Sequence, residues 1–375
     1  MNEKKNQPVN SKTYLLVYEL YAPNGQDVDF FEFIKKMAES GPINFEKIIY
    51  LSPEIITRIE SKFFAEGLIS ARKVMSDLTG IHQADELYLT SNWHRGNKIL
   101  LHCIDSGLKV CYGDSIGLFI PEGYFADKTF ASTVKKFNGI RNLALLWQGL
   151  KLYFRHPSRR PSFKVLSPVN FDIGYYLTLE LTSEKPSWPV HFTNKNALIQ
   201  TFNRYLRCLS FDLNNDPILR HPKVAFLLTT NFSEAQKMTF ENEIEAYLEY
   251  LKTYEEDGTA VIIKPHPRDS AIKLKYLQKR LMERYPVKVL DDKKDFFVPF
   301  ELFLIMLIEN NPDYINKIRY HTFSSACLSI KILFDKDPQV GMGEALVNKY
   351  FQPGFRKSRI AHEKDLKWLL AGKYE

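Results

Sequence analysis

The chain has 375 residues, of which 45% are hydrophobic and 25% charged, and its formal net charge is +7. The length favours about two domains, and the hydrophobic content supplies ample core material. No apolar run approaches the roughly 20 residues that cross a bilayer, and the first residues lack a secretory h-region, so we expect a cytoplasmic protein.

The amino-terminal half alternates predicted strands and helices. The predicted elements are strands at 14–19, 47–51 and 86–90, a helix at about 28–38, and a polar stretch at 91–97 that opens a helix ending at Cys103. Strand–helix alternation at this spacing favours a parallel, doubly wound sheet.

Asp114 follows a further predicted strand, Gly107–Tyr112, and lies between Gly113 and Gly117. The two glycines allow a tight turn of the backbone, which would present the carboxylate at the strand tip as a general base. An aspartate that only hydrogen-bonds the backbone of its own turn is the alternative.

The densest basic segment of the chain spans residues 151–164 and includes Arg155, Arg159 and Arg160. It is either a solvated loop or a contact for an anionic glycan or for the inner face of the membrane. The net charge would also suit nucleic acid. We expect no nucleic-acid partner, because the sequence shows no recognised binding fold and its other basic residues are dispersed.

The alternating pattern breaks at Asn214–Pro217, where we place a domain boundary. The predicted domains are therefore 1–213 and 214–350, both Rossmann-like, followed by a segment 351–375 whose helix is expected to pack back on the amino-terminal lobe. The second domain begins with a strand at 223–230 and a helix at about 239–253. Thr229, Thr230 and Asn231 end this strand and are candidate nucleotide contacts, although such a turn needs no function.

His266 lies between two prolines directly after the apolar strand Thr259–Lys264. The prolines cannot continue the ladder, so the imidazole is expected on a rigid turn at the carboxyl end of the strand, where α/β sheets bind ligands. A helix from Ala271 offers free N–H groups to an anion. The competing interpretations are a surface histidine in an ordinary turn and a Lys264 that merely flanks the strand.

A second polar turn, Ser324-Ser325, follows a strand that contains Arg319–Thr322 and precedes the apolar helical stretch Cys327–Phe334. Two adjacent hydroxyls and free helix N–H groups can form a phosphate cradle. A serine that only caps the helix is the alternative, and we expect Ser324 at the N-cap position.

The sequence indicates neither a metal site nor a cofactor. Asp291 and Asp292 lead directly into two lysines, which suits a solvated turn. No pair of cysteines has C-x-x-C spacing, so buried free thiols are expected rather than zinc ligands or disulfides; the four are Cys103, Cys111, Cys208 and Cys327.

Three motifs together, Asp114, His266-Pro267 and Ser324-Ser325, resemble those of the bacterial sialyltransferases and most closely the alpha-2,8-polysialyltransferase family, in the same order along the chain. The resemblance covers roughly residues 84–335. The family signature around the first acid has two acids before glycine, whereas Asp114 is a single acid that follows Gly113. A literal match to that signature, Glu255–Gly258, precedes the His-Pro strand and is interpreted as a polar loop.

The resemblance implies two Rossmann-like lobes of the glycosyltransferase B type with a cleft between them. It further implies inverting, metal-independent transfer of sialic acid from CMP-sialic acid to a glycan hydroxyl, with Asp114 as base and His266 facing the leaving phosphate. Pro267, Lys264 and the serine pair would share the phosphate, and Glu301, in a Pro-x-Glu stretch, would lie near the nucleotide. The alternatives are a transferase of another nucleotide-activated sugar and a non-catalytic protein that binds a phosphorylated ligand.

Overall fold

The computed structural model describes residues 12–18, 29–90, 95–113, 170–177, 188–206, 216–292, 296–310 and 312–371. The chain divides into two compact units, Leu51–Phe192 and a second unit that combines Met1–Tyr50 with Thr193–Glu375. The domain limits 1–213, 214–350 and 351–375 stay a prediction. Among the described residues, no helix is both long and apolar enough to span a membrane.

The unit Leu51–Phe192 contains a four-stranded sheet in the order β3-β4-β5-β6. All its strand pairs are parallel. The strands are β3 (Gln83–Leu89), β4 (Asp105–Gly113), β5 (Ile173–Tyr176) and β6 (Val190–Phe192). The strands predicted at 86–90 and 107–112 are confirmed as β3 and β4.

Three helices accompany this sheet: α2 (Pro53–Glu66), α3 (Leu68–Thr79) and α4 (Arg95–Cys103). Local signals begin and end them. Ser52 caps α2 by accepting a hydrogen bond from the Ile55 amide at 3.3 Å, and Pro53 occupies the first turn. Gly80 ends α3 in the left-handed conformation. Of these helices, α4 agrees with the helix predicted to end at Cys103, whereas α2 and α3 were not predicted.

A two-stranded sheet pairs β1 (Tyr14–Tyr18) with β2 (Lys47–Leu51), and α1 (Phe30–Ser40) connects the two strands. These three elements agree with the predicted ones. The Asp29 side chain caps α1 by accepting from the Glu32 amide at 3.1 Å. In α1, Phe30 packs against Phe297, with ring centroids 4.9 Å apart.

The second unit is built on a five-stranded sheet in the order β11-β10-β7-β8-β9. The strands are β7 (Val224–Leu228), β8 (Ala260–Lys264), β9 (Val287–Val289), β10 (Ile318–Thr322) and β11 (Gln339–Val340), and all pairs are parallel. Every residue of β7 and β8 is buried, as expected for central strands covered on both faces. From β7 the chain adds β8 and β9 on one side and then β10 and β11 on the other, so the order reverses between β7 and β10.

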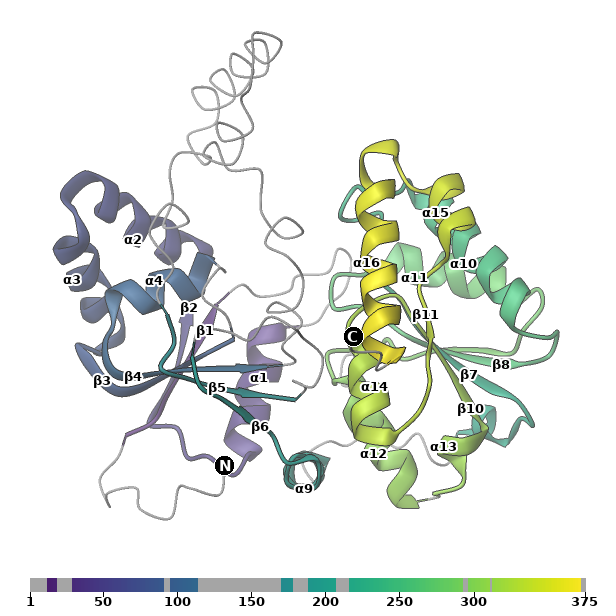
Figure 1. Cartoon of the computed structure of the whole chain (residues 1–375), viewed down its shortest axis with the longest axis horizontal. Helices are drawn as coiled ribbons and strands as arrows, with labels where there is room; N and C mark the ends of the chain where they lie inside the picture. The colour runs from purple at the N-terminus through teal and green to yellow at the C-terminus, as the bar shows by residue number, and fades with distance from the viewer. Residues whose placement is uncertain are drawn as a thin grey trace, which may run out of the picture. The chain divides into compact units, whose positions relative to one another are not determined.

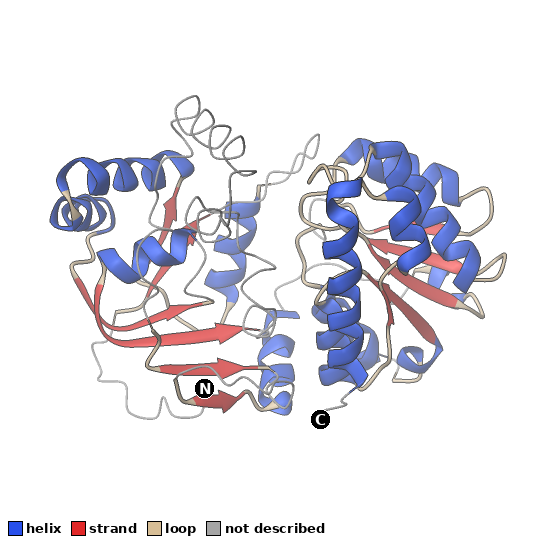
Figure 2. Cartoon of the chain, turned by 45° about the horizontal axis from the view of Figure 1, so that its top comes forward, coloured by secondary structure: helices blue, strands red, loops and turns tan. Residues whose placement is uncertain are grey.

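Helices cover both faces of this sheet (Figures 1 and 2). On one face lie α10 (Phe240–Tyr254), α11 (Ala271–Leu281) and α15 (Glu344–Tyr350); on the other lie α12 (Phe300–Asn310) and α14 (Ala326–Phe334), which α9 (Lys195–Leu206) contacts. The short α13 (Tyr314–Lys317) leads into β10. Strand–helix alternation with both faces covered confirms the predicted α/β class; the arrangement as two glycosyltransferase B lobes stays a prediction.

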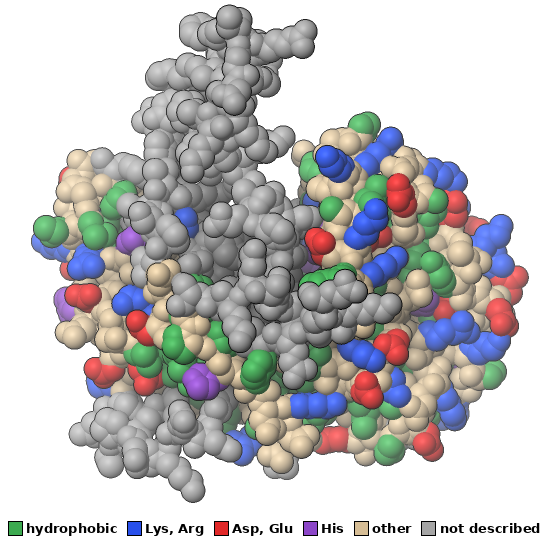
Figure 3. All heavy atoms as spheres, in the orientation of Figure 1, with side chains coloured by type: hydrophobic (Ala, Val, Ile, Leu, Met, Phe, Trp, Pro, Cys, Tyr) green, Lys and Arg blue, Asp and Glu red, His purple; other side chains and the backbone are tan. Residues whose placement is uncertain are grey.

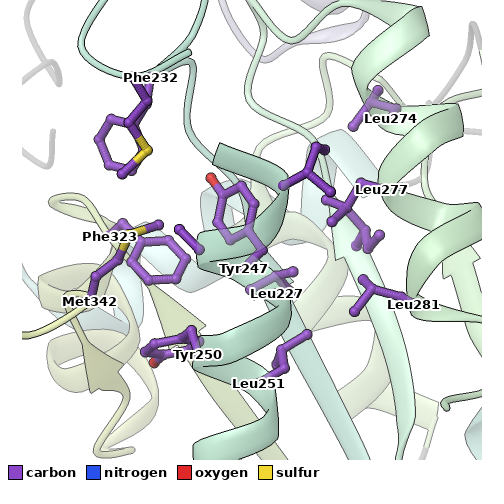
Figure 4. Packing of buried hydrophobic residues seen from close by; sticks show 14 of the residues in the cluster. Leu227, Phe232, Tyr247, Tyr250, Leu251, Leu274, Leu277, Leu281, Phe323 and Met342 are labelled. Atoms are coloured by element: carbon purple, nitrogen blue, oxygen red, sulfur yellow. The ribbon is translucent and has the colours of Figure 1, made fainter. Parts of the chain in front are cut away.

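The last helix, α16 (Pro353–Ala371), packs against α14 and α15. A helix in this segment was predicted, and its packing against the amino-terminal lobe stays a prediction. The core beneath α10 is aromatic: Tyr247 and Tyr250 lie against Phe323, with ring centroids 5.4 Å and 5.0 Å apart (Figure 4). Phe323 thereby anchors the turn that follows β10 in the hydrophobic core.

Candidate active site

The candidate site lies at the carboxyl edge of the five-stranded sheet. His266 follows β8, the serine pair follows β10, and β7 lies between these strands. Strands are spaced by roughly 5 Å, so the ends of β8 and β10 lie about 10 Å apart, with the end of β7 between them. The strand order reverses here, and ligands of open α/β sheets bind at such a switch point.

The turn that carries His266 is fixed by hydrogen bonds from the side chains around it. The His266 amide donates to Asp269 Oδ2 at 2.8 Å and to Thr229 Oγ1 at 3.2 Å. The Thr229 hydroxyl in turn donates to the same Asp269 oxygen at 2.5 Å. Pro265 and Pro267 restrict the backbone on either side. The turn is therefore rigid, as its two prolines predicted.

The imidazole of His266 has a defined tautomer. Its Nδ1 accepts a hydrogen bond from the Arg268 amide at 3.1 Å, so the proton of the neutral ring lies on Nε2. Burial, followed by the positive charges of Arg268 and Lys273, lowers the pKa of His266 to about 4. At neutral pH the ring is therefore uncharged and presents Nε2–H as a hydrogen-bond donor.

A buried charge network supports this turn. The Lys273 ammonium, fully buried on α11, contacts Asp269 Oδ1 at 2.7 Å, Glu234 Oε2 at 2.8 Å and Glu243 Oε1 at 3.1 Å. It also donates to the Thr230 carbonyl at 2.9 Å. One cation thus holds three acids from different elements, and it ties the end of β7 to the turn after β8.

The acids of the network also bind main-chain amides. Glu243 accepts from the Ser233 amide at 2.7 Å, and Glu234 accepts from the Ser270 amide at 3.0 Å. Ser270 caps α11. The loops after β7 and β8 are thus held to one another by charge-assisted hydrogen bonds inside the protein.

Burial and the neighbouring charges shift the pKa values of the groups in this network. Burial raises the pKa of Asp269 to about 6, against the lowering effect of Lys273. For Lys273, burial opposes the charged form, but the nearby carboxylates outweigh it and raise its pKa above the ordinary value. Lys273 therefore stays charged at neutral pH, while the acids around it compete for one cation.

The serine turn is held more loosely. The α14 helix begins at Ala326, and Ser325 is the cap residue, with no side-chain cap hydrogen bond. The Ser324 hydroxyl only approaches the Ala326 amide, at 3.5 Å. The prediction that Ser324 occupies the N-cap was therefore wrong by one residue. The chain first bends at Ser324, whose amide donates to the Thr322 hydroxyl at 3.3 Å, and this bend delays the start of the helix.

Three other predicted site residues are engaged inside the protein. Thr229 supports the His266 turn as described, and the Thr230 amide donates to the Tyr247 hydroxyl at 2.9 Å. The Lys264 ammonium is buried and donates to the Phe296 carbonyl at 2.7 Å. These contacts give each residue a structural role, and direct contact with a nucleotide stays a prediction.

Asn231, Pro267 and Glu301 are partly exposed. Asn231 follows β7 on the same edge as His266, and Glu301 lies in the first turn of α12. This helix begins at Phe300, directly after Pro299. The candidates Asp114, Arg155, Arg159 and Arg160 lie outside the described residues.

The strand that leads to Asp114 is described up to Gly113, whose carbonyl accepts from the Leu177 amide at 3.1 Å. Gly113 ends β4 with a φ of 151°, a conformation that residues with a side chain rarely adopt. The backbone at the end of β4 thus favours a glycine, and the placement of Asp114 on a turn after this strand stays a prediction.

Sequence reasoning missed the network around Lys273. The spacing of Asp269 and Lys273, four residues apart at the start of a helix, was the one local signal. Nothing in the sequence links them to Glu234 and Glu243. The acidic stretch Glu255–Gly258 is a loop, as predicted, and Glu255 is buried against His321 with 2.7 Å between Oε1 and Nε2.

A protein-family model supports the resemblance found in the sequence. The model described as Alpha-2,8-polysialyltransferase (POLYST) matches residues 125–315, just over half of the chain. The matched range contains the His266 turn and the Lys273 network and ends shortly before the serine pair. No curated protein matches the chain. By the extent of the family match, the chain belongs to the alpha-2,8-polysialyltransferase family and is a sialyltransferase.

Proposed function

We propose that the protein transfers sialic acid from CMP-sialic acid to a glycan hydroxyl by a single inverting displacement that requires no metal. Membership of a sialyltransferase family implies a nucleotide-sugar donor and a glycan acceptor and removes the non-catalytic alternative. The observation that carries the proposal further is the position of His266. It is a proline-locked imidazole with Nε2–H as donor, after the strand next to the point where the strand order reverses.

In this reaction an acceptor hydroxyl attacks the anomeric carbon of the sialyl group, and the bond from that carbon to the phosphate oxygen breaks. The electron pair of that bond leaves with CMP, and the hydroxyl loses its proton. Asp114 is the proposed base. The protein then has to stabilise the charge that grows on the departing phosphate, which preorganised donors do best.

His266 suits the role of phosphate donor because its turn is held before substrate binds. Its Nε2–H can donate to a phosphate oxygen while the ring is neutral. A bound phosphate would also favour the imidazolium and raise the pKa of His266 from its value of about 4 in the free protein. His266 can thereby pass from hydrogen-bond donor towards proton donor as CMP departs.

The serine pair would meet the same phosphate from the other side of β7. The hydroxyls of Ser324 and Ser325 and the first amides of α14 can donate to an anion at a helix amino terminus. Asn231, Pro267 and Glu301 are proposed to contact the rest of the nucleotide. For Thr229, Thr230 and Lys264 the internal hydrogen bonds favour a supporting role.

The acceptor glycan would bind the protein at a site of its own. We propose that the basic segment with Arg155, Arg159 and Arg160 meets an anionic glycan, and that the protein works in the cytoplasm, with peripheral contact to the inner membrane face. On the described surface seen in Figure 3, basic and acidic side chains are interspersed. This distribution favours a local contact over a broad basic face for nucleic acid.

The experiment that tests the proposal follows nucleotide release from the purified protein with CMP-sialic acid and a panel of UDP- and GDP-sugars, each with an oligosialic acid acceptor. We expect CMP release and product formation with CMP-sialic acid alone, unchanged in excess EDTA. Activity with another sugar would correct the donor. Activity that collapses with EDTA and returns with Mg²⁺ or Mn²⁺ would show that the metal-independent mechanism is wrong.

The base is tested by Asp114→Asn, which keeps the size of the side chain and removes its basicity. Transfer should be abolished while the unfolding midpoint stays close to that of the wild type. An active variant would exclude Asp114 as the base, and an unfolded one would return it to a structural role.

A further inference from the structure

The last helix brings a buried arginine to the serine turn. Arg359 of α16 donates from Nη1 to the Phe323 carbonyl at 3.0 Å. This carbonyl belongs to the peptide bond between Phe323 and Ser324, so the guanidinium lies directly beside the serine pair. The same group covers the ring of Phe232, in the loop after β7, at 4.9 Å from its centroid. Arg359 therefore joins the two loops between which the strand order reverses.

Glu363 pairs with Arg359 and also binds two main-chain amides. Arg359 Nε donates to Glu363 Oε1 at 2.7 Å, but the two carboxylate oxygens also accept from the Met342 and Gly343 amides, at 2.9 Å and 2.8 Å. Arg359 Nη2 is buried in the described structure and has no hydrogen-bond partner. A charged donor of this kind is costly to leave unsatisfied.

Lys237 places a second cation in the same neighbourhood. Its amide and its carbonyl bond Phe232 and Gln352, whereas within the described ranges its ammonium makes neither a hydrogen bond nor an ion pair. Burial, followed by the charge of Arg359, lowers the pKa of Lys237. The same two causes, in the same order, lower the pKa of His362 to about 4. His362 is therefore neutral at neutral pH, and Arg359 and Lys237 place two cations in one partly buried region, where Glu363 is the acid paired with Arg359.

Such an excess of cations out of water is unfavourable by itself, and a bound anion relieves it. The region adjoins the serine turn, where the proposed mechanism already places the donor phosphate. A sialyl donor carries a second anion, the sugar carboxylate, on the same anomeric carbon that bears the phosphate. If the donor phosphate binds at Ser324, the protein therefore needs a binding partner for the sialyl carboxylate close to that serine.

We propose that Lys237 and Arg359 form an anion subsite beside the serine pair that binds the carboxylate of a sialyl residue. The inference rests on the proposed function. The guanidinium offers a planar set of donors that matches a carboxylate, and the lysine adds a mobile charge. We place the sialyl residue of the donor in this subsite. The terminal sialyl residue of a sialylated acceptor carries the same carboxylate, and the binding experiment distinguishes the two.

The subsite is tested with Lys237→Met, because both main-chain bonds of Lys237 survive the substitution. Dissociation constants are measured by calorimetry for CMP, for the unreactive donor analogue CMP-3-fluoro-sialic acid, and for α-2,8-linked oligosialic acid. Lys237→Met should weaken the donor analogue by roughly 10- to 100-fold, the effect of losing a charged hydrogen bond, and leave CMP within about twofold. Lys237→Arg should restore most of the affinity.

Lys279→Met, an exposed lysine of α11, is the matched control for the lost charge and should bind all three probes as the wild type does. A loss confined to oligosialic acid would assign the carboxylate to the acceptor and keep the subsite. Equal losses for CMP and the donor analogue, or unchanged binding of all three probes in folded Lys237→Met, would overturn it.

The subsite and the proposed function fail in different ways. If only the subsite is wrong, the wild type still releases CMP from CMP-sialic acid and Lys237→Met matches it. If the function is wrong, the wild type neither binds CMP nor transfers sialic acid. The double variant Arg359→Gln with Glu363→Gln removes both charges of the buried pair and, where it folds, should show the same selective loss for the donor analogue as Lys237→Met.

Discussion

The turn after β8 and the turn after β10 supply the two halves of the proposed phosphate site, and they are held in opposite ways. The His266 amide has two side-chain acceptors, which the buried Lys273 network fixes in turn. The Ser325 side chain makes no cap hydrogen bond, and the Ser324 hydroxyl only approaches the Ala326 amide, at 3.5 Å. A group that must donate along one direction in the transition state needs such support, whereas hydroxyls can rotate to meet a bound phosphate.

The largest effect should come from His266→Ala. It removes the donor to the leaving phosphate and the acceptor of the exposed Arg268 amide, but it keeps both bonds of the His266 amide. Turnover should therefore fall roughly 100- to 10,000-fold with little change in stability. Steady-state kinetics and thermal unfolding measure the two quantities. Wild-type turnover in a folded variant would remove His266 from the mechanism and, with it, the reason for a rigid turn after β8.

The network beneath that turn should matter for folding. Lys273→Met leaves three carboxylates without their common cation in the interior, and the free energy of unfolding should fall by about 3–5 kcal/mol, as when one partner of a buried ion pair is removed. Denaturant unfolding provides the measurement. The exposed Lys279→Met on the same helix is the control, with a change within about 0.5 kcal/mol. Equal stability of the two variants would mean that the network does not support the turn.

The serine turn should matter for binding rather than for folding. Ser324→Ala combined with Ser325→Ala removes two hydroxyls that contribute little to the cap of α14, so stability should change little. The affinity for CMP should fall by about 1–3 kcal/mol, the range for charged hydrogen bonds. Calorimetry that gives wild-type CMP affinity for the double variant would contradict the phosphate role of the pair.

The smallest effect is a pH dependence. The pKa of His266 is lowered to about 4, so the stability that the neutral ring contributes is complete above about pH 6.5 and is lost as the pH falls towards 4. In an NMR titration of the free protein the ring should titrate near pH 4, and saturating CMP should raise this pKa by about one unit or more. A pKa that CMP leaves unchanged would separate His266 from the phosphate.

Local patterns in the sequence predicted much of the fold. The apolar runs at 223–230 and 259–264 are buried central strands, and the helices after them begin at capped positions such as Thr239 and Ser270. The prolines around His266 also act over a few residues, and the backbone of that turn agrees with the prediction. The turn predicted at Asp114 lies outside the described residues and stays a prediction. The cap of α14 was misplaced by one residue because the chain bends at Ser324 before the helix begins.

The sequence by itself determined the α/β class, the strands that end in His266 and in the serine pair, and the resemblance to polysialyltransferases, because each depends on neighbouring residues and their order. Only the tertiary structure decided that Lys273 joins acids from the loop after β7, from α10 and from the turn after β8, and that Arg359 reaches the serine turn from the last helix. Such contacts depend on the strand order of the sheet, which brings together segments separated by 30 to 40 residues or more, and no local pattern encodes that order.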